Sequence, residues 1–301
     1  MRPSVREIAA GKWRGILVAL GFDNGMLNGR HQSCPICRDG KDRFRWDDKD
    51  GSGSFYCNHC GSGTGVDLVM AVKGLDFKEA AKEIERAAGF IKPEAYKAAK
   101  TDADKVDALR RVWKESRPVV EGDEVWCYLT GRGLSIPNTT ALRFHPDMYY
   151  REGEVTGRYP AMLALVSAPN GSGASIHRTY LKDGRKAPVE KAKKIMPGLP
   201  ISGAAVRLFP SSPVLGIAEG IETALGAAQR FAIPVWSAVS AQGMESWVCP
   251  AGVEEVVIFA DHDITYTGQK AAYALAYRLH EKKIRVRVEI PEIAGRDWAD
   301  V

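Results

Sequence analysis

The sequences VLGIAE at residues 214–219 and VVIFADHD at residues 256–263 decide the fold of this chain. Each begins with an apolar run too short for a helix, and each is followed by a turn that contains glycine, which predicts strands buried on both faces of a parallel sheet. Glu219 ends the first run, and Asp261 and Asp263 end the second. Because open α/β sheets hold ligands at the carboxyl ends of their strands, we expect the three acids to meet at one edge.

Three carboxylates at one edge of a sheet repel one another unless a cation lies between them. Hard oxygen ligands favour Mg²⁺ or Mn²⁺, so Glu219, Asp261 and Asp263 predict a metal-dependent phosphoryl-transfer centre. The alternative is that each acid only caps a helix. Glu219 precedes apolar residues at helical spacing, which would place it near the positive end of a helix.

This order of elements resembles the Toprim fold, which DnaG-type primases share with type IA and type II topoisomerases and some nucleases. The family pattern is a strand ending in Glu-Gly and a later strand ending in Asp-x-Asp, here Glu219-Gly220 and Asp261-His262-Asp263. A candidate strand at 233–239, a helical pattern at 272–279 and an alternating edge strand at 284–290 extend the likeness. The resemblance implies an α/β domain with a mainly parallel sheet.

The same resemblance implies a second catalytic ion, for which Glu222, Asp297 and Asp300 are the candidate ligands. Bacterial relatives place an aspartate four residues after the first glutamate, where this chain has Thr223. Either Glu222, one position earlier, takes that part, or the second ion is held more loosely.

Four of the six cysteines form two Cys-x-x-Cys pairs on either side of residues 38–56: Cys34, Cys37, Cys57 and Cys60. In a chain without a secretory signal, this pattern favours metal ligation over disulfides. Two such knuckles close four thiolates around one tetrahedral Zn²⁺ and leave no position open for catalysis. The spacing therefore predicts a structural zinc ribbon.

Between the two cysteine pairs, basic or polar residues alternate with aromatic ones, as in a small antiparallel ribbon. Arg43, Arg45 and Trp46 are candidates for contacts with single-stranded nucleic acid, because bases stack on aromatic faces beside arginines. The alternative is that Phe44, Trp46 and Phe55 form the small core of the ribbon.

The ribbon also resembles the zinc-binding domain of satellite-phage alpha-type primases, which implies a part in template recognition. The residues that carry this resemblance are CPIC at 34–37, KDRFR at 41–45, FYCNHC at 55–60 and GTGVDL at 63–68.

The positive charge of the chain is concentrated in one stretch. The formal net charge is +5, and the stretch between Arg178 and Lys194 alone holds seven basic residues against two acidic ones. Such a run suits a polyphosphate or a nucleic-acid backbone, and the alternative is a solvated loop. The candidate phosphate contacts are Arg178, Lys186, Lys191, Lys193, Lys194 and Arg207.

Length and composition predict a soluble protein of two or three domains, and the strand patterns and resemblances above imply α+β and α/β folds for them. Of the 301 residues, 45% are hydrophobic and 26% are charged, as in ordinary globular proteins. We expect a zinc-binding domain with an N-terminal helix at 1–90, a linker at 91–107, a basic, mixed α+β primase subdomain at 108–211 and a Toprim domain at 212–301. No segment has the length or the flanks of a membrane span or a signal peptide, which predicts a cytoplasmic protein.

Taken together, these resemblances imply a DNA primase of a phage, prophage or mobile element. Its expected ligands are single-stranded DNA, ribonucleoside triphosphates, one structural Zn²⁺ and one or two catalytic Mg²⁺ or Mn²⁺ ions. No P-loop motif occurs, so we expect a replicative helicase as a separate partner or as a fused part of a longer chain. The alternatives are a Toprim nuclease and a non-catalytic nucleic-acid-binding replication factor.

Overall fold

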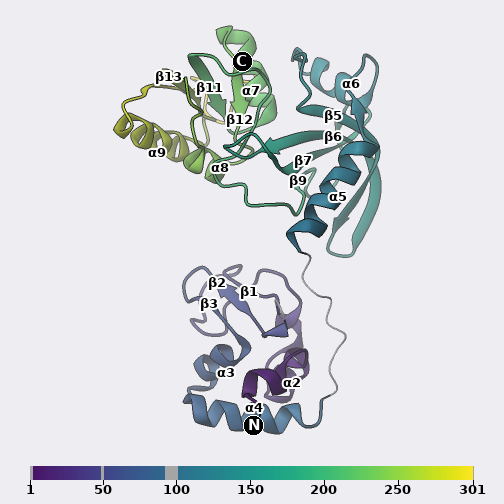
Figure 1. The fold of residues 1–301 in the computed structure, drawn as a ribbon, viewed down its shortest axis with the longest axis vertical. Coiled ribbons are helices and arrows are strands. Elements are labelled where there is room, and N and C mark those ends of the chain that lie inside the picture. The colour runs from purple at the N-terminus through teal and green to yellow at the C-terminus, as the bar shows by residue number, and fades with distance from the viewer. Residues whose placement is uncertain (1–2, 49–50, 92–100, 301) are drawn as a thin grey trace. The chain divides into compact units, whose positions relative to one another are not determined.

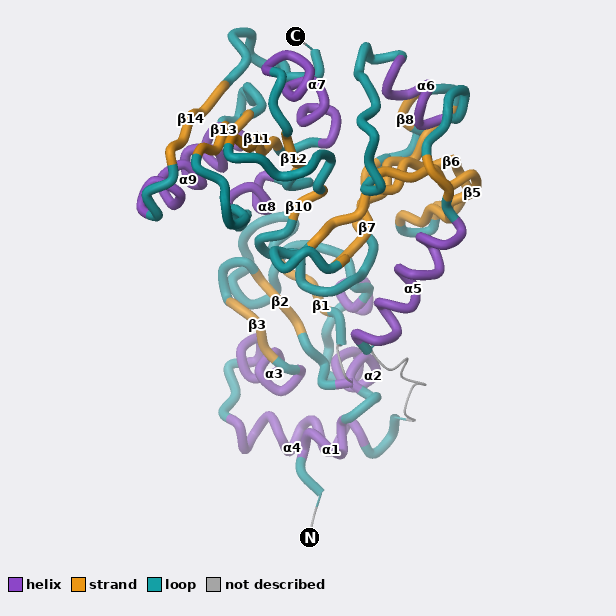
Figure 2. The backbone as a smooth tube through the Cα atoms, turned by 45° about the horizontal axis from the view of Figure 1, so that its top comes forward, coloured by secondary structure: helices purple, strands orange, loops and turns teal. Residues whose placement is uncertain are grey.

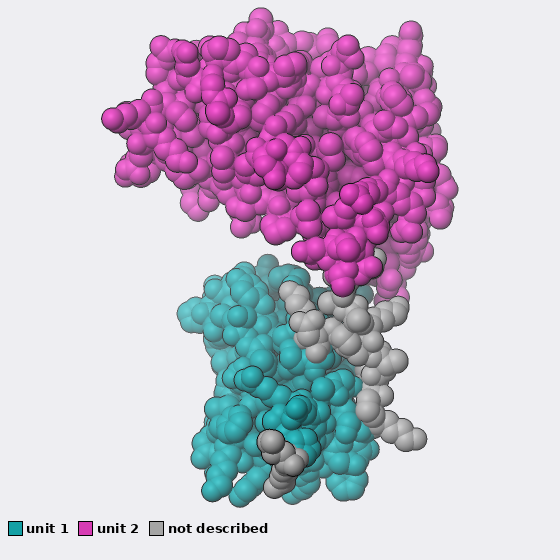
Figure 3. Space-filling view, viewed as in Figure 1, with its two compact units in different colours: residues 1–100 teal, residues 101–301 magenta. Residues whose placement is uncertain are grey.

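The computed structural model describes residues 3–48, 51–91 and 101–300. The chain forms two compact units, residues 1–100 and residues 101–301 (Figures 1 and 3). Most of the predicted linker, residues 92–100, lies outside the described residues, and its last part belongs to the helix that starts at Asp102. The finer domain boundaries at 90, 107 and 211 remain predictions.

The first unit is a zinc ribbon with helices packed against it. A three-stranded antiparallel sheet has the order β1-β2-β3, with Arg45 opposite Tyr56 in the register. The described elements are α1 (Val5–Ala9), α2 (Trp13–Ala19), the 3₁₀ helix η1 (Asn24–Leu27), β1 (Phe44–Trp46), β2 (Phe55–Cys57), β3 (Gly61–Gly63), α3 (Gly65–Lys73) and α4 (Phe77–Ala88).

Local sequence explains the helices of this unit. Trp13, Ile16 and Leu17 recur at helical spacing, and in α2 all three are at most 1% exposed in the core of the unit. Helices α3 and α4 each begin with a capping box, in which the cap side chain and the acid three residues later satisfy backbone amides at the helix start.

The second unit is built on one continuous mixed sheet. Among residues 101–300 its strands form an 11-stranded sheet whose main path runs β14-β13-β11-β12-β10-β6-β5-β4, and β7 pairs with β6. The first part contains α5 (Asp102–Glu115), β4 (Arg117–Pro118), α6 (Glu124–Thr130), β5 (Leu142–Glu152), β6 (Val155–Ser167), β7 (Gly173–Lys182), β8 (Arg185–Lys186), β9 (Lys193–Ile195) and β10 (Ala205–Val206).

The second part of this unit contains the parallel strands. Neighbours among β11, β12, β13 and β14 all pair in parallel, which confirms the predicted mainly parallel sheet. The elements are β11 (Val214–Ala218), α7 (Ile221–Phe231), β12 (Val235–Ser237), α8 (Ala241–Ser246), β13 (Glu255–Phe259), α9 (Thr267–Glu281) and β14 (Arg285–Glu289).

Helices cover both faces of the parallel strands, so this part of the unit has three layers: helix, sheet and helix (Figure 2). Alternate residues of β11 and β13 point to opposite faces, so Ala218 and Phe259 pack with α7 while Ile217 and Ile258 pack with α8 and α9. This double burial explains why both strands read as continuous apolar runs. Within the described residues no helix has the length and apolar character needed to cross a membrane.

Short strand β10 joins the two parts of the sheet. It pairs antiparallel with β12 on one side and with β6 on the other. The backbone ladder therefore continues from the basic region into the parallel region without a break. As a result, strand β9, which carries part of the basic run, belongs to the same sheet as the strands that carry the acids.

Candidate metal and nucleotide site

The four predicted zinc ligands come together at the edge of the ribbon. Their sulfur atoms all lie within 4.8 Å of one another, and no other group of three or more His, Cys, Asp or Glu side chains among the described residues has its ligand atoms this close together. The Sγ atoms of Cys34 and Cys60 are 3.8 Å apart, which is about the separation that a tetrahedron with Zn–S bonds of about 2.3 Å requires. The backbone amides of His59 and Cys60 point at Sγ of Cys57, at 3.4 and 3.5 Å. The donor set fits a closed structural zinc site.

The histidines near the thiols are not part of this cluster. The Nδ1 atom of His31 lies 3.0 Å from the carbonyl oxygen of Asp42. Four thiolates complete a tetrahedral shell by themselves, so the site needs no further ligand.

The aromatic residues of the ribbon divide into core and surface. Trp46 is only 7% exposed and packs in the core with Phe44, while Tyr56 is 45% exposed. Tyr56 lies opposite Arg45 in the sheet, and both line a hollow of about 530 Å³. Tyr56, rather than Trp46, therefore offers an aromatic face to a ligand. The inside–outside alternation of a strand was the sequence signal for it.

The two arginines of the ribbon each have an acidic partner. Arg43 pairs with Asp39 at 2.8 Å, and Arg45 pairs with Asp47 at 3.2 Å. Both pairs are partly exposed, so their contribution to stability is small and a phosphate can compete for the guanidinium groups.

The predicted acids stand at the carboxyl ends of neighbouring parallel strands. Glu219 follows β11, and Asp261 and Asp263 follow β13, which pairs with β11 over its whole length. Burial and then the Asp263 carboxylate raise the pKa of Glu219, while a hydrogen bond from the backbone of Ala241 opposes them. The three side chains are close enough to interact but lie farther apart than the four thiols.

Asp261 has the most perturbed carboxyl group of this edge. Burial, followed by the charges of Glu219 and Asp297, raises its pKa to about 7. Its Oδ1 atom is buried and has no hydrogen-bond partner among the described residues. A buried carboxylate oxygen without a partner is costly, and a cation that binds it removes both the loss of solvation and the repulsion. The acid edge therefore fits a divalent metal ion.

Helix capping, the alternative explanation of the acids, applies to Asp263 and in part to Glu219, which accepts from the backbone of Ala241, the first residue of α8. The Oδ2 atom of Asp263 accepts a hydrogen bond of 2.9 Å from the amide of Gly268 in the first turn of α9. A Cβ atom at Gly268 would lie 2.9 Å from the carbonyl oxygen of Asp261, so glycine lets α9 approach the acid edge. Glu219 makes no such bond to the start of α7, whose N-cap is Gly220.

Glu222, a predicted ligand of a second ion, lies inside a hydrogen-bonded network. It is 2% exposed, its Oε1 atom accepts a bond of 2.6 Å from the hydroxyl of Tyr128, and its Oε2 atom accepts a bond of 2.8 Å from Nζ of Lys193. Burial alone would raise the pKa of Glu222, but the Lys193 ammonium and the two hydrogen bonds outweigh it and lower the pKa to about 2. The carboxylate is therefore ionised and paired.

The two C-terminal acids differ in their orientation. Burial is the main cause that raises the pKa of Asp297, and Asp300 adds to it; Asp297 is also within electrostatic reach of Asp261. Asp300 instead accepts a bond of 3.0 Å from Arg132. Of the two, Asp297 is the one that faces the acid edge.

The basic run divides into two groups. Lys193, and with it Lys186, lies within electrostatic reach of Glu222. Lys191 and Lys194 instead both bind the carboxylate of Glu152 at the end of β5. Lys193 is also within electrostatic reach of Glu219 and Asp261, and Lys186 is within reach of Asp297.

Arg178 and Arg207 are held by the sheet itself. Arg178 lies over the ring of Tyr180, 5.6 Å from its centroid. Arg207 lies over Trp236 and donates hydrogen bonds of 2.9 and 3.0 Å to the carbonyl oxygens of Ala168 and Pro169. Neither guanidinium is directed at Glu222 by a hydrogen bond.

Sequence reasoning missed two residues of this site, Tyr128 and Arg132. Both belong to the segment around α6, about ninety positions before Glu222. Their side chains interact with Glu222 only because the fold brings the segment around α6 within reach of it. No local pattern in the sequence pairs them with this acid.

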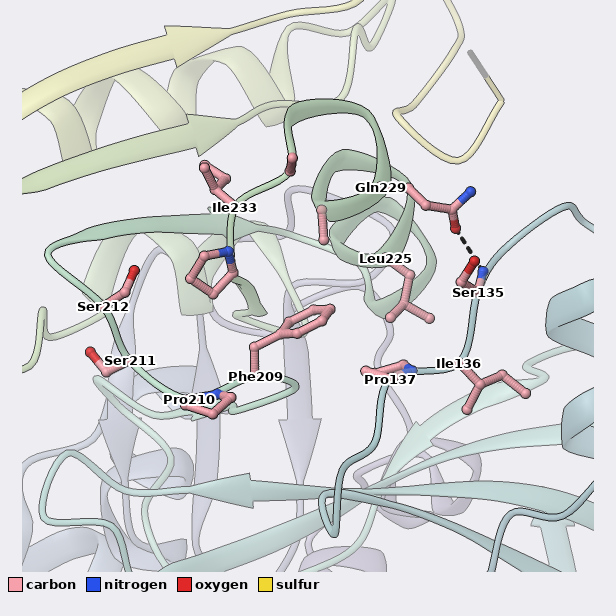
Figure 4. A pocket seen from close by; sticks show the side chains of 13 residues that line it. Ser135, Ile136, Pro137, Phe209, Pro210, Ser211, Ser212, Leu225, Gln229 and Ile233 are labelled. Carbon is pink, nitrogen blue, oxygen red and sulfur yellow. Dashed lines mark hydrogen bonds between the residues drawn. The ribbon is translucent and has the colours of Figure 1, made fainter.

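A separate pocket lies on another side of α7 (Figure 4). It measures about 470 Å³ and is lined mainly by apolar side chains such as Ile136, Phe209 and Leu225. The amide of Ser135 donates a bond of 2.6 Å to Gln229 at its rim. None of the described residues that line the pocket is charged, so it offers no groups for phosphate chemistry.

Family models match three consecutive regions of the chain. Residues 29–66 match the zinc-binding domain of primase-helicase, residues 214–301 match the Toprim domain, and residues 103–208 match a domain of unknown function (DUF7146). The chain thus contains a Toprim domain at residues 214–301 and a primase-type zinc ribbon at residues 29–66. These matches confirm the two domain types and the fold class expected from the sequence.

Solved structures of primases are similar to the chain at low sequence identity. The Aquifex aeolicus primase, with zinc-binding and RNA polymerase domains, is 16% identical over 100% of this chain and 82% of that chain, with a TM-score of 0.46. The primase fragment of the bacteriophage T7 primase-helicase is 18% identical over 90% and 92%, with a TM-score of 0.41. The catalytic core of the E. coli primase is 14% identical over 65% and 73%, with a TM-score of 0.42.

Proposed function

We propose that the chain is a DNA primase, which joins ribonucleotides into short primers on single-stranded DNA. The observation that carries the proposal is the acid edge: the buried Oδ1 atom of Asp261 has no partner among the described residues, and Glu219 and the ammonium of Lys193 are within electrostatic reach of this carboxylate. This pairing of acids with nearby cations is what nucleotidyl transfer needs, because the reaction brings a triphosphate and its metal together. The primase zinc ribbon and the Toprim domain support the same conclusion.

The acid edge would hold Mg²⁺ or Mn²⁺ through Glu219, Asp261 and Asp263, with Asp297 as the candidate for a second ion. Bound there, the metal would supply positive charge that polarises a phosphate and stabilises the pyrophosphate that leaves. In the reaction the 3′ oxygen of the primer forms a bond to the α-phosphorus of the incoming nucleotide, and the bond to pyrophosphate breaks.

The residues of the chain itself bind and orient the reactants. Lys193 would contact the triphosphate, because it lies within electrostatic reach of Glu219 and Asp261. Lys186, which is within reach of Glu222 and Asp297, would assist it. Arg45 and Tyr56 would contact the template at the ribbon, through charge and base stacking. The protein contributes positioning and charge neutralisation rather than covalent chemistry.

A priming assay tests this function. The chain is incubated with a single-stranded DNA oligonucleotide, labelled ribonucleotides and Mg²⁺ or Mn²⁺, and the product is sized on a gel. Asp261→Asn and Glu219→Gln should abolish synthesis, whereas Asp107→Asn, at an exposed position on α5, should not. Primer synthesis by Asp261→Asn would show that the active site lies elsewhere.

The same assay separates the two alternative functions. With a labelled oligonucleotide and no ribonucleotides, a Toprim nuclease would cleave the DNA, and a primase would leave it intact. A non-catalytic binding factor would bind DNA but would bind no Mn²⁺ at Glu219, so titration of Mn²⁺ against the wild-type chain and Glu219→Gln distinguishes it.

The biological setting is part of the same proposal. We propose that the chain acts in the cytoplasm, in the replication of a phage, prophage or mobile element, together with a replicative helicase that is fused or separate. The match of residues 29–66 to the zinc-binding domain of primase-helicase supports the helicase as a partner. Copurification with a helicase from the same element would test it.

A further inference from the structure

We propose that Glu222 is a positioning residue and not a metal ligand: together with Tyr128 it holds the ammonium of Lys193 beside the acid edge, where that ammonium receives the phosphates of the nucleotide. The inference rests on the proposed function, which it deepens by naming how the lysine is held. It replaces the interpretation of Glu222 as a ligand of the second ion.

Both oxygens of Glu222 are already in use. Tyr128 donates to Oε1 at 2.6 Å, and Lys193 donates to Oε2 at 2.8 Å. Asp261, by contrast, keeps a buried oxygen without any partner. The two carboxylates therefore differ in what they lack: Asp261 needs a cation, and Glu222 already has one.

A divalent ion on Glu222 would also meet the ammonium of Lys193. Metal–oxygen bonds of Mg²⁺ measure about 2.1 Å, and Nζ of Lys193 lies 2.8 Å from the same carboxylate. The ion and the ammonium would stand within about 5 Å of each other in a partly buried site, where repulsion costs several kcal/mol. The pair thus excludes a metal from this carboxylate for as long as Lys193 stays in place.

Lys193 is accessible on its other side. Its side chain is 38% exposed, whereas that of Glu222 is 2% exposed. An ammonium has three N–H donors, and Glu222 is the one hydrogen-bond partner of Nζ among the described residues. The free donors lie within electrostatic reach of Glu219 and Asp261, so a phosphate bound to the metal at that edge can take them.

Tyr128 fixes the carboxylate that holds the lysine. It lies on α6, is 3% exposed, and donates its hydroxyl hydrogen to Glu222. Burial and the neighbouring Glu222 carboxylate raise the pKa of Tyr128, which keeps the phenol protonated and able to donate. Three elements, α6, α7 and β9, thereby fix one ammonium.

Two binding measurements on the full zinc-loaded chain test this role: the affinity for Mn²⁺ alone, followed by electron paramagnetic resonance, and the affinity for ATP in the presence of saturating Mn²⁺. Glu222→Gln should leave Mn²⁺ affinity within about twofold of wild type and weaken ATP binding about tenfold, the loss of one charge-assisted hydrogen bond. Asp261→Asn should lose Mn²⁺ affinity by tenfold or more. Glu281→Gln, on the exposed end of α9, is the matched control and should change neither.

The inference is overturned if Glu222→Gln weakens Mn²⁺ binding as Asp261→Asn does, because Glu222 would then be a ligand. It is also overturned if ATP affinity does not change. Tyr128→Phe provides the test should Glu222→Gln not fold, with unchanged Mn²⁺ affinity and ATP binding weakened by about threefold or more. A chain that gives these results but makes no primer would refute the proposed function and leave the role of Glu222 intact.

Discussion

Replacing Lys193 with methionine should strongly destabilise the second unit. The substitution preserves most of the side-chain volume but removes the ammonium, so the buried Glu222 loses the partner that lies 2.8 Å from its Oε2 atom. The Tyr128 hydroxyl remains and compensates only part of the charge. Removal of one partner of a buried ion pair costs about 3–5 kcal/mol.

The pKa of Glu222 gives a second value for the stability that Lys193→Met removes. The pKa of Glu222 is about 2 instead of the ordinary 4.5, and 1.36 kcal/mol per pKa unit converts this difference into about 3 kcal/mol of stability at pH 7. Because 38% of the Lys193 side chain is exposed, solvent screens the pair, and about 3 kcal/mol is the upper end of the range. We expect Lys193→Met to lower the free energy of unfolding by about 2–3 kcal/mol.

The Lys193→Met substitution should reverse the sign of the pH dependence that Glu222 contributes to stability. In the wild-type chain the pKa of Glu222 is lowered by folding, so its contribution is present above pH 4.5 and is lost as the pH falls toward about 2. In Lys193→Met burial dominates, the pKa of Glu222 rises above its ordinary value, and the variant should gain stability as the pH falls from 8 to 5. Glu222→Gln combined with Lys193→Met should recover most of the loss.

Urea unfolding of the full chain between pH 5 and 8 measures these effects. Comparison of zinc-loaded with chelated protein identifies the transition of the second unit, which contains none of the zinc ligands. Lys182→Met, at an exposed position on β7, is the matched control. A loss below about 1 kcal/mol for Lys193→Met, or no recovery in the double variant, would refute the buried ion pair.

Three further predictions concern the zinc site, the C-terminal segment and the basic run. Chelation or Cys57→Ser should release one zinc per chain and unfold the first unit, because the ribbon has only a small core without its metal. Metal analysis measures the zinc and circular dichroism measures the unfolding, and retained structure after complete zinc loss would contradict this. Gly226→Ala should lower the stability measured by thermal unfolding by about 1–3 kcal/mol, because its Cβ atom would lie 2.0 Å from the carbonyl oxygen of Trp298. Gly89→Ala is the control and should have little effect, because the nearest contact of its Cβ atom is at 3.5 Å. Neutralisation of the lysines in the basic run should flatten the plot of log binding constant for single-stranded DNA against log salt concentration, by about 0.7 for each lysine that contacts a phosphate; an unchanged slope would place the DNA on another surface. The lysines to replace are Lys186, Lys191, Lys193 and Lys194.

The Toprim domain and the primase-type zinc ribbon could be recognised from local patterns. The runs before Glu219 and Asp261 are apolar because both faces of β11 and β13 are buried, and that burial leaves a visible trace in the sequence. The four thiols are visible for a similar reason, since each pair of zinc ligands comes from one tight turn and their spacing is fixed locally. The structure confirmed both patterns as folded elements.

Other features were ambiguous at the level of sequence. Trp46 and Tyr56 are both aromatic residues of the ribbon, but only the pairing of β1 with β2 shows that Trp46 is in the core and Tyr56 is exposed. The basic run reads as one cluster along the chain. In the fold Lys193 turns toward Glu222, while Lys191 turns toward Glu152.

The sequence by itself determined which chemical groups this protein has and which strands deliver them, because strand burial and ligand spacing are properties of short segments. Tertiary structure alone decided that Tyr128, Glu222 and Lys193 form one network, since they come from α6, α7 and β9 and are up to 94 positions apart. The physical reason is that a buried charge needs a partner, and which partner it finds depends on how β10 joins the two parts of the sheet. No pattern within one segment carries that information.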